Sequence, residues 1–378
     1  MHLSEKMRLS LVNWLFTTLY GLRLGEVLRL LRRHHFAVDL AYIPRMGLML
    51  LGGVLTSLFA RYEALRYGRQ IAQTTVEAPI FILGHWRSGT TFLHNLMVVD
   101  EQFASPNLWQ VLNPHTFLTT ERFAGIVKHV SPKDRMMDSV DLSVDAPFED
   151  EFATCGTLCS PFLSWVFPRD AKQYDKYLTF AEATPEELSR WKGSLLRFFQ
   201  KVTWKYDRTL LLKSPPHTCR IKILLDLFPD ARFIHIYRDP FDVFRSSKRQ
   251  IEVSFLTNTL QQARPEDLDS WIITRYRMMY DAYFAERDLI PPGQFCEVRF
   301  EDLEIDPVGE VAKIYAGLGL PDFAQMQPAL EGYVASLGEY RKNAHRPLPT
   351  PLRSTILSAW ARCFEAWGYG QSLTMKEQ

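Results

Sequence analysis

The chain has 378 residues, of which 47% are hydrophobic and 23% are charged. These are ordinary values for a soluble globular protein, so the composition excludes a disordered chain, a collagen-like fibre and a disulfide scaffold. The 44 Lys and Arg nearly balance the 43 Asp and Glu, for a net charge of +1. A mainly electrostatic DNA- or RNA-binding protein usually carries a strong basic excess, so we expect no nucleic-acid partner.

Residues 1–78 form a basic and apolar segment with a net charge of +5, whereas the remainder of the chain carries −4. The longest uncharged stretch of this segment, Met46–Ala60, has fifteen residues. A membrane-spanning helix needs ~20. Pro44 favours the start of a helix. Two interpretations are open: a pair of helices that packs on the main domain or on a second subunit of a homo-oligomer, and an interfacial segment whose apolar faces and arginines touch a membrane.

After residue 78 the sequence alternates short apolar runs, typical of buried strands, with stretches of helical spacing. This alternation predicts a parallel sheet covered on both faces, with ligands bound beyond the carboxyl ends of the strands. The predicted pairs are a strand over Pro79–Gly84 with a helix over Thr90–Val99, a strand over Leu210–Lys213 with a helix over His217–Phe228, a strand over Arg232–Tyr237 with a helix from Pro240, and a strand over Phe295–Phe300 with a helix over Pro307–Gly317.

The stretch over residues 100–209 lacks clear strands and is rich in Pro, Phe and Trp. We interpret it as inserted helices and loops that form a lid or an acceptor pocket. The predicted organisation is therefore a basic helical segment over residues 1–78, followed by one α/β domain over residues 79–378 that contains this insert.

The most informative stretch, Gly84-His-Trp-Arg-Ser-Gly-Thr-Thr91, follows a strand and opens a helix. In that context, backbone N–H groups and the helix dipole hold an anion such as a phosphate. The glycine spacing matches a P-loop, but Thr90 stands where an NTPase needs a Lys. An ATP- or GTP-hydrolysing machine with bound magnesium is therefore disfavoured. We expect a nucleotide that carries a short acidic chain, and no metal.

A second polar stretch begins where the strand over Arg232–Tyr237 ends. Arg238 offers a planar fork for a second phosphate group, and Ser246, about two helical turns further on, offers a hydroxyl group. Because the carboxyl ends of parallel strands share one edge of the sheet, we expect Arg238 and Ser246 to lie beside the phosphate loop.

The two motifs together, Arg87-Ser-Gly-Thr-Thr91 and Arg238-x7-Ser246, resemble the sulfotransferases that use 3′-phosphoadenosine 5′-phosphosulfate (PAPS), most closely their broad bacterial-type branch. Further similarities follow in the same order over about residues 79–345, among them Lys213-Ser-Pro-Pro-His217 and Phe300-Glu-Asp-Leu303. The resemblance implies a P-loop-like three-layer sandwich with a central parallel sheet, to which the N-terminal helical segment is added.

The resemblance also implies a set of donor-binding residues. In the family the first motif binds the 5′-phosphosulfate, the Arg and Ser of the second motif bind the 3′-phosphate, and a C-terminal basic stretch adds a further 3′-phosphate contact. The sequence departs from many cytosolic animal members of the family at two positions: Arg87, where they have Lys, and Asn343, where they have Gly. The positions that match are Arg87, Ser88, Gly89, Thr90, Thr91, Arg238, Ser246, Arg341, Lys342 and Asn343.

Sulfuryl transfer is an in-line displacement in which positioning and electrostatics dominate, as in phosphoryl transfer. The donor oxygens need positive charge, the acceptor hydroxyl needs a base, and the leaving phosphate needs stabilisation. We assign Arg87, with the loop amides, to the sulfuryl and bridging oxygens. Lys213, at the carboxyl end of a predicted strand, is the second cation of the predicted active site.

The general base has several candidates. His217 is the first choice, because imidazole accepts a proton near neutral pH. The rival is the acidic cluster around Glu149 and Glu151, where flanking Phe residues would desolvate a carboxylate and raise its pKa, and one of these carboxylates would act as the base or orient His217. His85 and His115 are lesser candidates.

The aromatic stretch Pro161–Pro168 and Trp109 have two interpretations, an acceptor pocket or core packing. A pocket of this kind predicts an apolar or lipid-like alcohol, or a phenol, as the acceptor, and the basic N-terminal segment suits an enzyme that takes its substrate from a membrane surface. Two other functions compete with sulfuryl transfer: a nucleotide-dependent kinase that uses the same loop, and an inactive nucleotide-binding scaffold.

The five cysteines are scattered, and no second Cys or His pair completes a zinc site with Cys155 and Cys159. No small-residue cleavage site follows the N-terminal apolar stretch. We therefore expect reduced thiols in a cytoplasmic protein, peripheral to a membrane if the N-terminal segment is interfacial.

Overall fold

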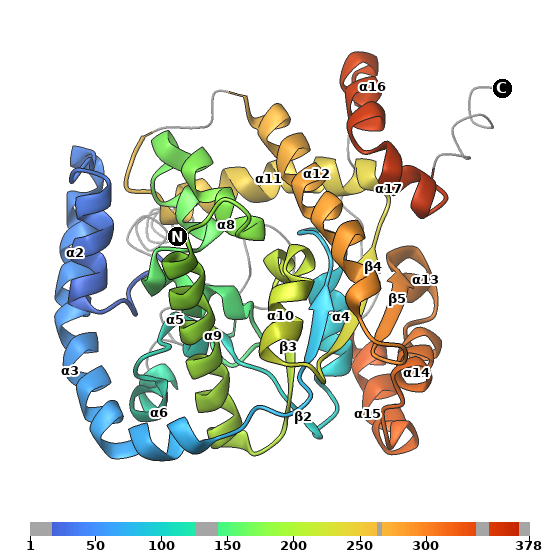
Figure 1. Ribbon diagram of the computed structural model, residues 1–378, viewed down its shortest axis with the longest axis horizontal. Helices are drawn as coiled ribbons and strands as arrows, with labels where there is room; N and C mark the ends of the chain where they lie inside the picture. The colour runs from blue at the N-terminus through green and yellow to red at the C-terminus, as the bar shows by residue number, and fades with distance from the viewer. Residues whose placement is uncertain (1–16, 126–142, 263–266, 338–347, 370–378) are drawn as a thin grey trace, which may run out of the picture. The chain divides into compact units, whose positions relative to one another are not determined.

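The computed structural model of the chain describes residues 17–125, 143–262, 267–337 and 348–369. The chain forms two compact units and passes between them several times (Figure 1). The first, which we call the helical unit, comprises Met1–Val76, Ala104–Leu210 and Arg249–Glu266. The second, the sheet unit, comprises Glu77–Phe103, Leu211–Lys248 and Asp267–Gln378.

Five strands form one sheet in the order β2-β3-β1-β4-β5. The central strand β1 pairs in parallel with β3 and β4, and β4 pairs in parallel with β5. The predicted parallel sheet is therefore confirmed. The sequence analysis missed β2, because its two residues are too few to leave a pattern. The strands are β1 (Ile80–Leu83), β2 (Phe103–Ala104), β3 (Thr209–Lys213), β4 (Arg232–Tyr237) and β5 (Phe295–Arg299).

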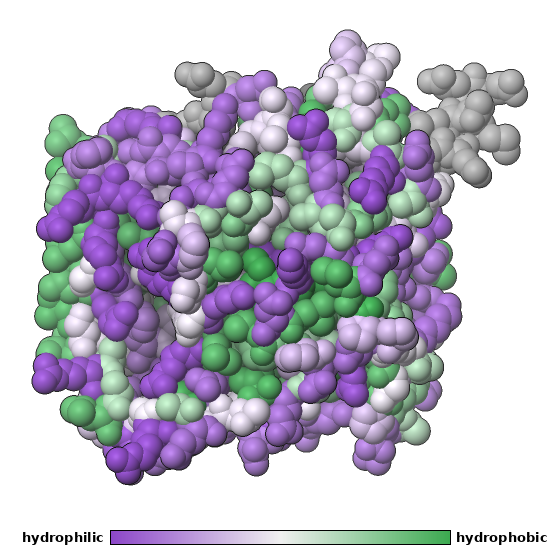
Figure 2. Space-filling model, viewed as in Figure 1, coloured by the Kyte–Doolittle hydropathy of each residue, from purple (hydrophilic) through white to green (hydrophobic). Residues whose placement is uncertain are grey.

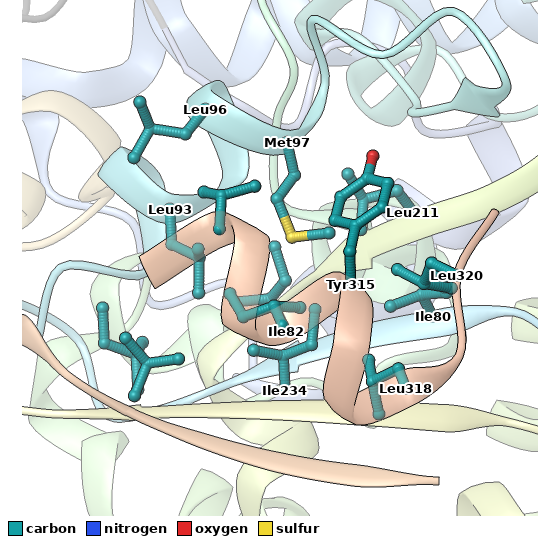
Figure 3. Packing of buried hydrophobic residues seen from close by; sticks show 14 of the residues in the cluster. Ile80, Ile82, Leu93, Leu96, Met97, Leu211, Ile234, Tyr315, Leu318 and Leu320 are labelled. Carbon is teal, nitrogen blue, oxygen red and sulfur yellow. The ribbon is translucent and has the colours of Figure 1, made fainter. Parts of the chain in front are cut away.

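Helices cover both faces of this sheet, because neighbouring residues of a strand point to opposite sides and both sets are apolar. Ile80 belongs to a core that α4, α14 and α15 complete, with helix side chains packed against strand side chains (Figure 3). On the other face Phe81 lies beside Phe228, at the end of α10, and His235 stacks on Tyr283 of α12. The predicted three-layer sandwich is thus confirmed. The covering helices are α4 (Thr90–Met97), α10 (Ile221–Leu227), α12 (Leu268–Glu286), α14 (Pro307–Leu318) and α15 (Phe323–Ser336).

The predicted bounds of one helix are wrong. The stretch His217–Phe228 does not form one continuous helix, because a 3₁₀ helix, η6 (Pro215–Cys219), precedes α10. Arg220 separates them with φ −140° and ψ 26°, outside the helical region. His217 therefore lies in a tight proline-led turn. The sheet unit also contains η7 (Arg287–Leu289), α13 (Phe300–Ile305), α16 (Thr350–Ala359) and α17 (Ala361–Ala366), and α11 (Pro240–Asn258) begins there.

The helical unit contains the two N-terminal helices, α2 (Leu24–Arg33) and α3 (Ile43–Gln73), and the long helix α9 (Pro185–Tyr206). Pro44 lies in the first turn of α3, as the sequence predicts. Pro185 opens α9 after Thr184, whose hydroxyl accepts the N–H of Glu187 at 3.2 Å. The other helices of this unit are η1 (Leu40–Tyr42), α5 (Leu108–Leu112), α6 (Phe117–Thr120), η2 (Glu121–Phe123), η3 (Asp150–Thr157), η4 (Pro161–Trp165), η5 (Pro168–Tyr174) and α8 (Lys176–Thr179).

Candidate active site

The predicted phosphate loop is a tight turn between β1 and α4. Gly84 has a φ of +146° and Gly89 a φ of +99°, values that L-residues rarely adopt. A Cβ on Gly84 would lie 2.5 Å from the backbone oxygen of Ile236, and a Cβ on Gly89 would lie 2.2 Å from Cδ2 of Phe300. Both positions therefore require glycine, for their backbone conformation and for the close approach of their neighbours.

Side chains from neighbouring elements fix the course of the loop. The Gly84 N–H donates to Oγ1 of Thr218 at 2.7 Å, and the His85 N–H donates to the hydroxyl of Tyr280 at 3.3 Å. The Ser88 hydroxyl donates to the carbonyl oxygen of His85 at 2.8 Å. No described side chain caps the N-terminus of α4, so the first amides of this helix are available to an anion.

Arg87, Ser246 and Arg238 meet beside this loop. Nε of Arg87 donates to Oγ of Ser246 at 2.7 Å, and Nη1 of Arg238 lies 3.5 Å from the carbonyl oxygen of Arg87. The backbone of Arg87 has a φ of +70°, a conformation that a residue with a Cβ adopts at a cost. The expected proximity of Arg238 and Ser246 to the phosphate loop is therefore observed.

Several buried donors around the start of α11 have unsatisfied hydrogen-bonding capacity. Within the described part of the chain, Nε of Arg238, Nε of Arg245 and Oγ of Ser247 find no hydrogen-bond partner. The guanidinium of Arg238 also lies 4.4 Å from the centroid of the Phe300 ring, and its Nη2 lies 3.5 Å from the Asp242 carboxylate. Buried donors without an acceptor cost free energy, so this set fits an anionic group with several oxygen atoms, such as a phosphate.

Lys213 supplies a buried cation near the loop. Its side chain leaves the end of β3 and is only 1% exposed, and Nζ lies 3.4 Å from Oγ1 of Thr91 in α4. This is the face of the sheet that α4 covers. Lys213 thus lies next to the last residue of the predicted phosphate motif.

His217 lies in η6, next to Thr218, whose Oγ1 accepts the N–H of Gly84. It is fully buried, and its ring packs edge-on against Phe81 with centroids 5.4 Å apart. Phe81 points to the face opposite the one that Lys213 and α4 share. The structure therefore does not bring His217 and Lys213 onto one face of the sheet, and the role of His217 as a general base stays a prediction.

The two lesser candidates for the base, His85 and His115, each lie within hydrogen-bonding distance of another protein group. His85 is buried, with Nδ1 at 2.7 Å from the carbonyl oxygen of Trp86, and burial lowers its pKa to about 3. In the helical unit, Nε2 of His115 lies 3.1 Å from the carboxylate of Glu26. Burial by itself would raise the pKa of Glu26, but hydrogen bonds from His115 and Arg23 outweigh it and hold the pKa at about 2. We therefore assign neither histidine to catalysis.

The predicted acidic cluster lies in the helical unit, at the start of η3. Glu149 is partly exposed, whereas Glu151 is fully buried. Nearby, the ring of Phe162 lies 4.3 Å from that of Phe152 and 4.7 Å from that of Trp165, measured between centroids. These rings pack on one another as core residues do, so a role for the aromatic stretch in lining an acceptor pocket stays a prediction.

The predicted C-terminal donor contacts, Arg341, Lys342 and Asn343, lie outside the described residues. Their role stays a prediction from the family resemblance.

Three residues that contact the phosphate loop or lie next to its neighbours were not predicted from the sequence as site residues. Ser247 directly follows Ser246, Phe300 opens the Phe-Glu-Asp-Leu motif after β5, and Thr218 follows His217. Their positions inside or next to recognised motifs were the available signal. Nothing local in the sequence indicates that Phe300 contacts both Gly89 and Arg238, because those contacts join segments that are far apart along the chain.

The chain is similar to known proteins in sequence and in fold. The sequence model of the sulfotransferase family matches residues 79–325. Over 359 residues, the chain is 37% identical to omega-hydroxy-beta-dihydromenaquinone-9 sulfotransferase Stf3 of Mycobacterium bovis, which covers 94% of this chain and 92% of the relative. Among solved structures, the fold is similar to that of sulfotransferase STF9 from Mycobacterium avium, with a TM-score of 0.69 and 20% identity over 91% of this chain and 96% of that one. For sulfotransferase STF1 from Mycobacterium tuberculosis the TM-score is 0.62, with 17% identity over 89% of this chain and 92% of that one. The kinase alternative is not favoured.

Proposed function

This chain belongs to the sulfotransferase family, and we propose that it transfers the sulfuryl group of PAPS to a hydroxyl group of an apolar, lipid-like acceptor. The observation that carries the donor assignment is the meeting of Arg87, Arg238 and Ser246 beside a loop that two glycines keep narrow. Each of these side chains offers hydrogen-bond donors, as a ligand with two phosphate groups requires.

The donor site has two parts. The amides of the loop and of the first turn of α4, together with Arg87, Ser88, Thr90 and Thr91, suit the 5′-phosphosulfate. Arg238 and Ser246 suit the 3′-phosphate. We further propose that Arg341, Lys342 and Asn343 complete this second part, on the strength of the family resemblance.

The proposed reaction is an in-line displacement at sulfur. The acceptor oxygen forms a bond to sulfur while the bond from sulfur to the bridging phosphate oxygen breaks. A general base takes the hydroxyl proton, and adenosine 3′,5′-bisphosphate leaves. The positive charges of Arg87 and Lys213 offset the charge that develops on the sulfuryl and leaving oxygens. We expect no metal requirement, since the loop lacks the P-loop Lys that accompanies magnesium in NTPases.

The acceptor proposal rests on the curated relative. Its name gives a hydroxylated dihydromenaquinone as the substrate, and the similarity extends over nearly the whole of both chains. We therefore propose that the acceptor of this chain is also a lipid with a hydroxyl group on a long apolar body.

Transfer of labelled sulfuryl from PAPS tests both parts of the proposal. We expect the purified chain to label an omega-hydroxylated menaquinone, with or without a chelator, and to leave sugar alcohols unlabelled. Labelling of sugars alone would overturn the acceptor proposal. Phosphate transfer from ATP and magnesium, with no sulfuryl transfer, would overturn the proposed reaction.

Calorimetric titration with adenosine 3′,5′-bisphosphate isolates the donor site from catalysis. A hydrogen bond to a charged group contributes about 1.5–3 kcal/mol, so Arg238→Ala and Ser246→Ala should each weaken binding by roughly tenfold or more. Arg277→Ala, which removes an exposed arginine of α12, is the matched control. The transfer assay identifies the general base. It is the residue whose replacement abolishes sulfuryl transfer while adenosine 3′,5′-bisphosphate still binds, and the variants to compare are His217→Asn, Glu149→Gln and Glu151→Gln.

A further inference from the structure

Exposed apolar side chains are concentrated on the N-terminal helices. Of the fifteen large hydrophobic side chains exposed among the described residues, eleven lie between Leu28 and Leu65. Figure 2 shows hydrophobic side chains, in green, over α2 and α3. Soluble monomers rarely expose a contiguous apolar patch of this kind unless something binds to it.

Helix α3 has two distinct faces within the helical unit. Its inner face is packed: a Cβ on Gly53 would lie 3.0 Å from Cα of Leu24, and Glu63 forms a buried ion pair with Lys201 of α9 at 2.7 Å. Its outer face carries six exposed residues at alternating spacings of three and four, which places them on one side of the helix. We call them the outer stripe: Leu48, Leu51, Leu55, Leu58, Tyr62 and Leu65.

The exposed charged residues of α3 itself are all positive. At about 100° per residue, Arg61 and Arg66 lie on its two margins, and Arg69 continues it at the C-terminal end; all three are exposed. The one acidic residue of α3, Glu63, points inward to Lys201. The outer face therefore combines an apolar centre with a basic margin, which is complementary to an anionic lipid surface.

A second copy of the chain is a poorer match to this face. The three-four spacing would suit a coiled coil, in which Arg61 and Arg66 occupy the positions that flank the apolar seam. A parallel pair would bring these arginines against each other. In either orientation, α3 offers no exposed carboxylate to pair with them.

A transmembrane helix is also a poorer match. Contrary to the sequence-based expectation, one described helical stretch, Leu40–Gln73, is long and apolar enough to cross a membrane. The inner face of this stretch, however, holds a fully buried Arg45, whose Nη1 donates to the carbonyl oxygen of Thr259 at 2.5 Å. Insertion across a bilayer would break this bond and the Glu63–Lys201 pair, whereas contact along the outer stripe leaves both intact.

We propose that the outer stripe of α3 docks this protein on the surface of an anionic bilayer, with its leucines in the acyl region and its three arginines among the headgroups. This interaction goes beyond the proposed reaction and does not depend on it, because docking needs neither donor nor acceptor. A membrane-bound enzyme would meet a lipid acceptor at high local concentration.

Co-sedimentation of the full chain with vesicles tests the proposal. We expect binding to vesicles of phosphatidylglycerol and phosphatidylcholine, and much weaker binding to phosphatidylcholine alone. The triple variant Leu51→Ser, Leu55→Ser, Leu58→Ser and the triple variant Arg61→Gln, Arg66→Gln, Arg69→Gln should each reduce binding at least about tenfold. Ile305→Ser and Arg208→Gln, at exposed positions outside the stripe, are matched controls that should bind as the unmodified chain does.

The same variants also test two other ways in which the outer stripe could be covered, by a second copy of the chain or by residues 1–16. If the chain is a dimer that the leucine variant dissociates, and vesicles are not bound, a second copy covers the stripe and the proposal is overturned. If vesicles bind only a chain that begins at Thr17, residues 1–16 cover the stripe and the proposal is equally overturned. Unchanged calorimetric binding of adenosine 3′,5′-bisphosphate shows that each variant is folded.

Discussion

The ring of Phe300 lies between the phosphate loop and the guanidinium of Arg238. Its centroid is 4.4 Å from that guanidinium, and its Cδ2 fills the space that a side chain on Gly89 would need. One aromatic side chain therefore contacts both Gly89 of the phosphate loop and Arg238.

Gly89→Ala should damage both stability and donor binding. The added Cβ would lie 2.2 Å from Phe300 and would sit on a backbone with a φ of +99°. Strain and overpacking of this kind cost about 1–3 kcal/mol each. We therefore expect urea unfolding to show a loss of about 2–6 kcal/mol in the free energy of unfolding. Calorimetry should show weaker binding of adenosine 3′,5′-bisphosphate, because Phe300 must shift against Arg238.

The matched control is Gly332→Ala in α15. A Cβ at this glycine meets nothing within 4 Å, so the substitution should stabilise the protein by about 0.4–1 kcal/mol. Equal stability of the Gly89 and Gly332 variants would contradict the close contact with Phe300. The glycines at 84 and 89 were visible in the loop spacing, whereas one of the two reasons for glycine at 89 is a contact with a side chain more than two hundred residues away.

A polar cluster, in which His235 is buried and Glu297 is partly exposed, joins strands β4 and β5 and helix α12. Nδ1 of His235 lies 2.9 Å from Oε1 of Glu297, which also accepts the hydroxyl of Tyr283 at 2.7 Å. Burial by itself would raise the pKa of Glu297, but the hydrogen bonds from His235 and Tyr283 outweigh it and hold the pKa at about 2. Burial also lowers the pKa of His235, so the neutral imidazole is favoured.

Glu297→Gln should destabilise the protein more at neutral pH than in acid. The pKa of Glu297 is about 2 in the folded chain and has an ordinary value of 4.5. The carboxylate therefore stabilises the fold fully above the ordinary value, and this contribution is lost as the pH falls towards 2. We expect the stability gap between the unmodified chain and the variant to narrow by no more than about 1 kcal/mol between about pH 6 and about pH 3, because solvent screens the partly exposed carboxylate.

Denaturant titrations at both pH values measure this gap. Tyr283→Phe keeps the carboxylate of Glu297 and removes one of its two hydrogen-bond donors. The difference in stability between the unmodified chain and Tyr283→Phe should therefore also decrease as the pH falls, but by less than for Glu297→Gln. A constant gap for Glu297→Gln would contradict the linkage. The sequence predicted both strands correctly, but the cluster could not be inferred, because apolar periodicity does not reveal which polar residues of three separate elements meet.

Across the described residues, local patterns predicted the sheet and the proximity of Arg238 and Ser246 to the phosphate loop, but they did not predict the larger packing. The apolar runs and the turns that end them are encoded within a few residues, so the strands, their parallel pairing and the place of Arg238 and Ser246 followed from spacing. The change of composition near residue 78 suggested a boundary between an added segment and a domain. In the structure, however, residues 1–76 and 104–210 belong to the same compact unit. Their packing depends on distant pairs such as Glu63 and Lys201, which no local pattern reveals.

Deletion of residues 1–78 tests whether this segment is an addition to an independent domain or part of a compact unit that the rest of the chain needs. The deletion removes α3, and with it the carboxylate that pairs with Lys201, a side chain only 5% exposed. It also uncovers the apolar surface of α9 against which α3 packs. We expect residues 79–378 alone to aggregate or to lose a cooperative thermal transition, as calorimetry and near-ultraviolet circular dichroism would show.

Glu63→Gln should give an intermediate effect, a loss of about 3–5 kcal/mol in the free energy of unfolding, because it leaves one buried charge without its partner. A fragment that keeps the melting temperature and circular dichroism of the full chain would show that the first 78 residues are an appendage to a self-sufficient domain.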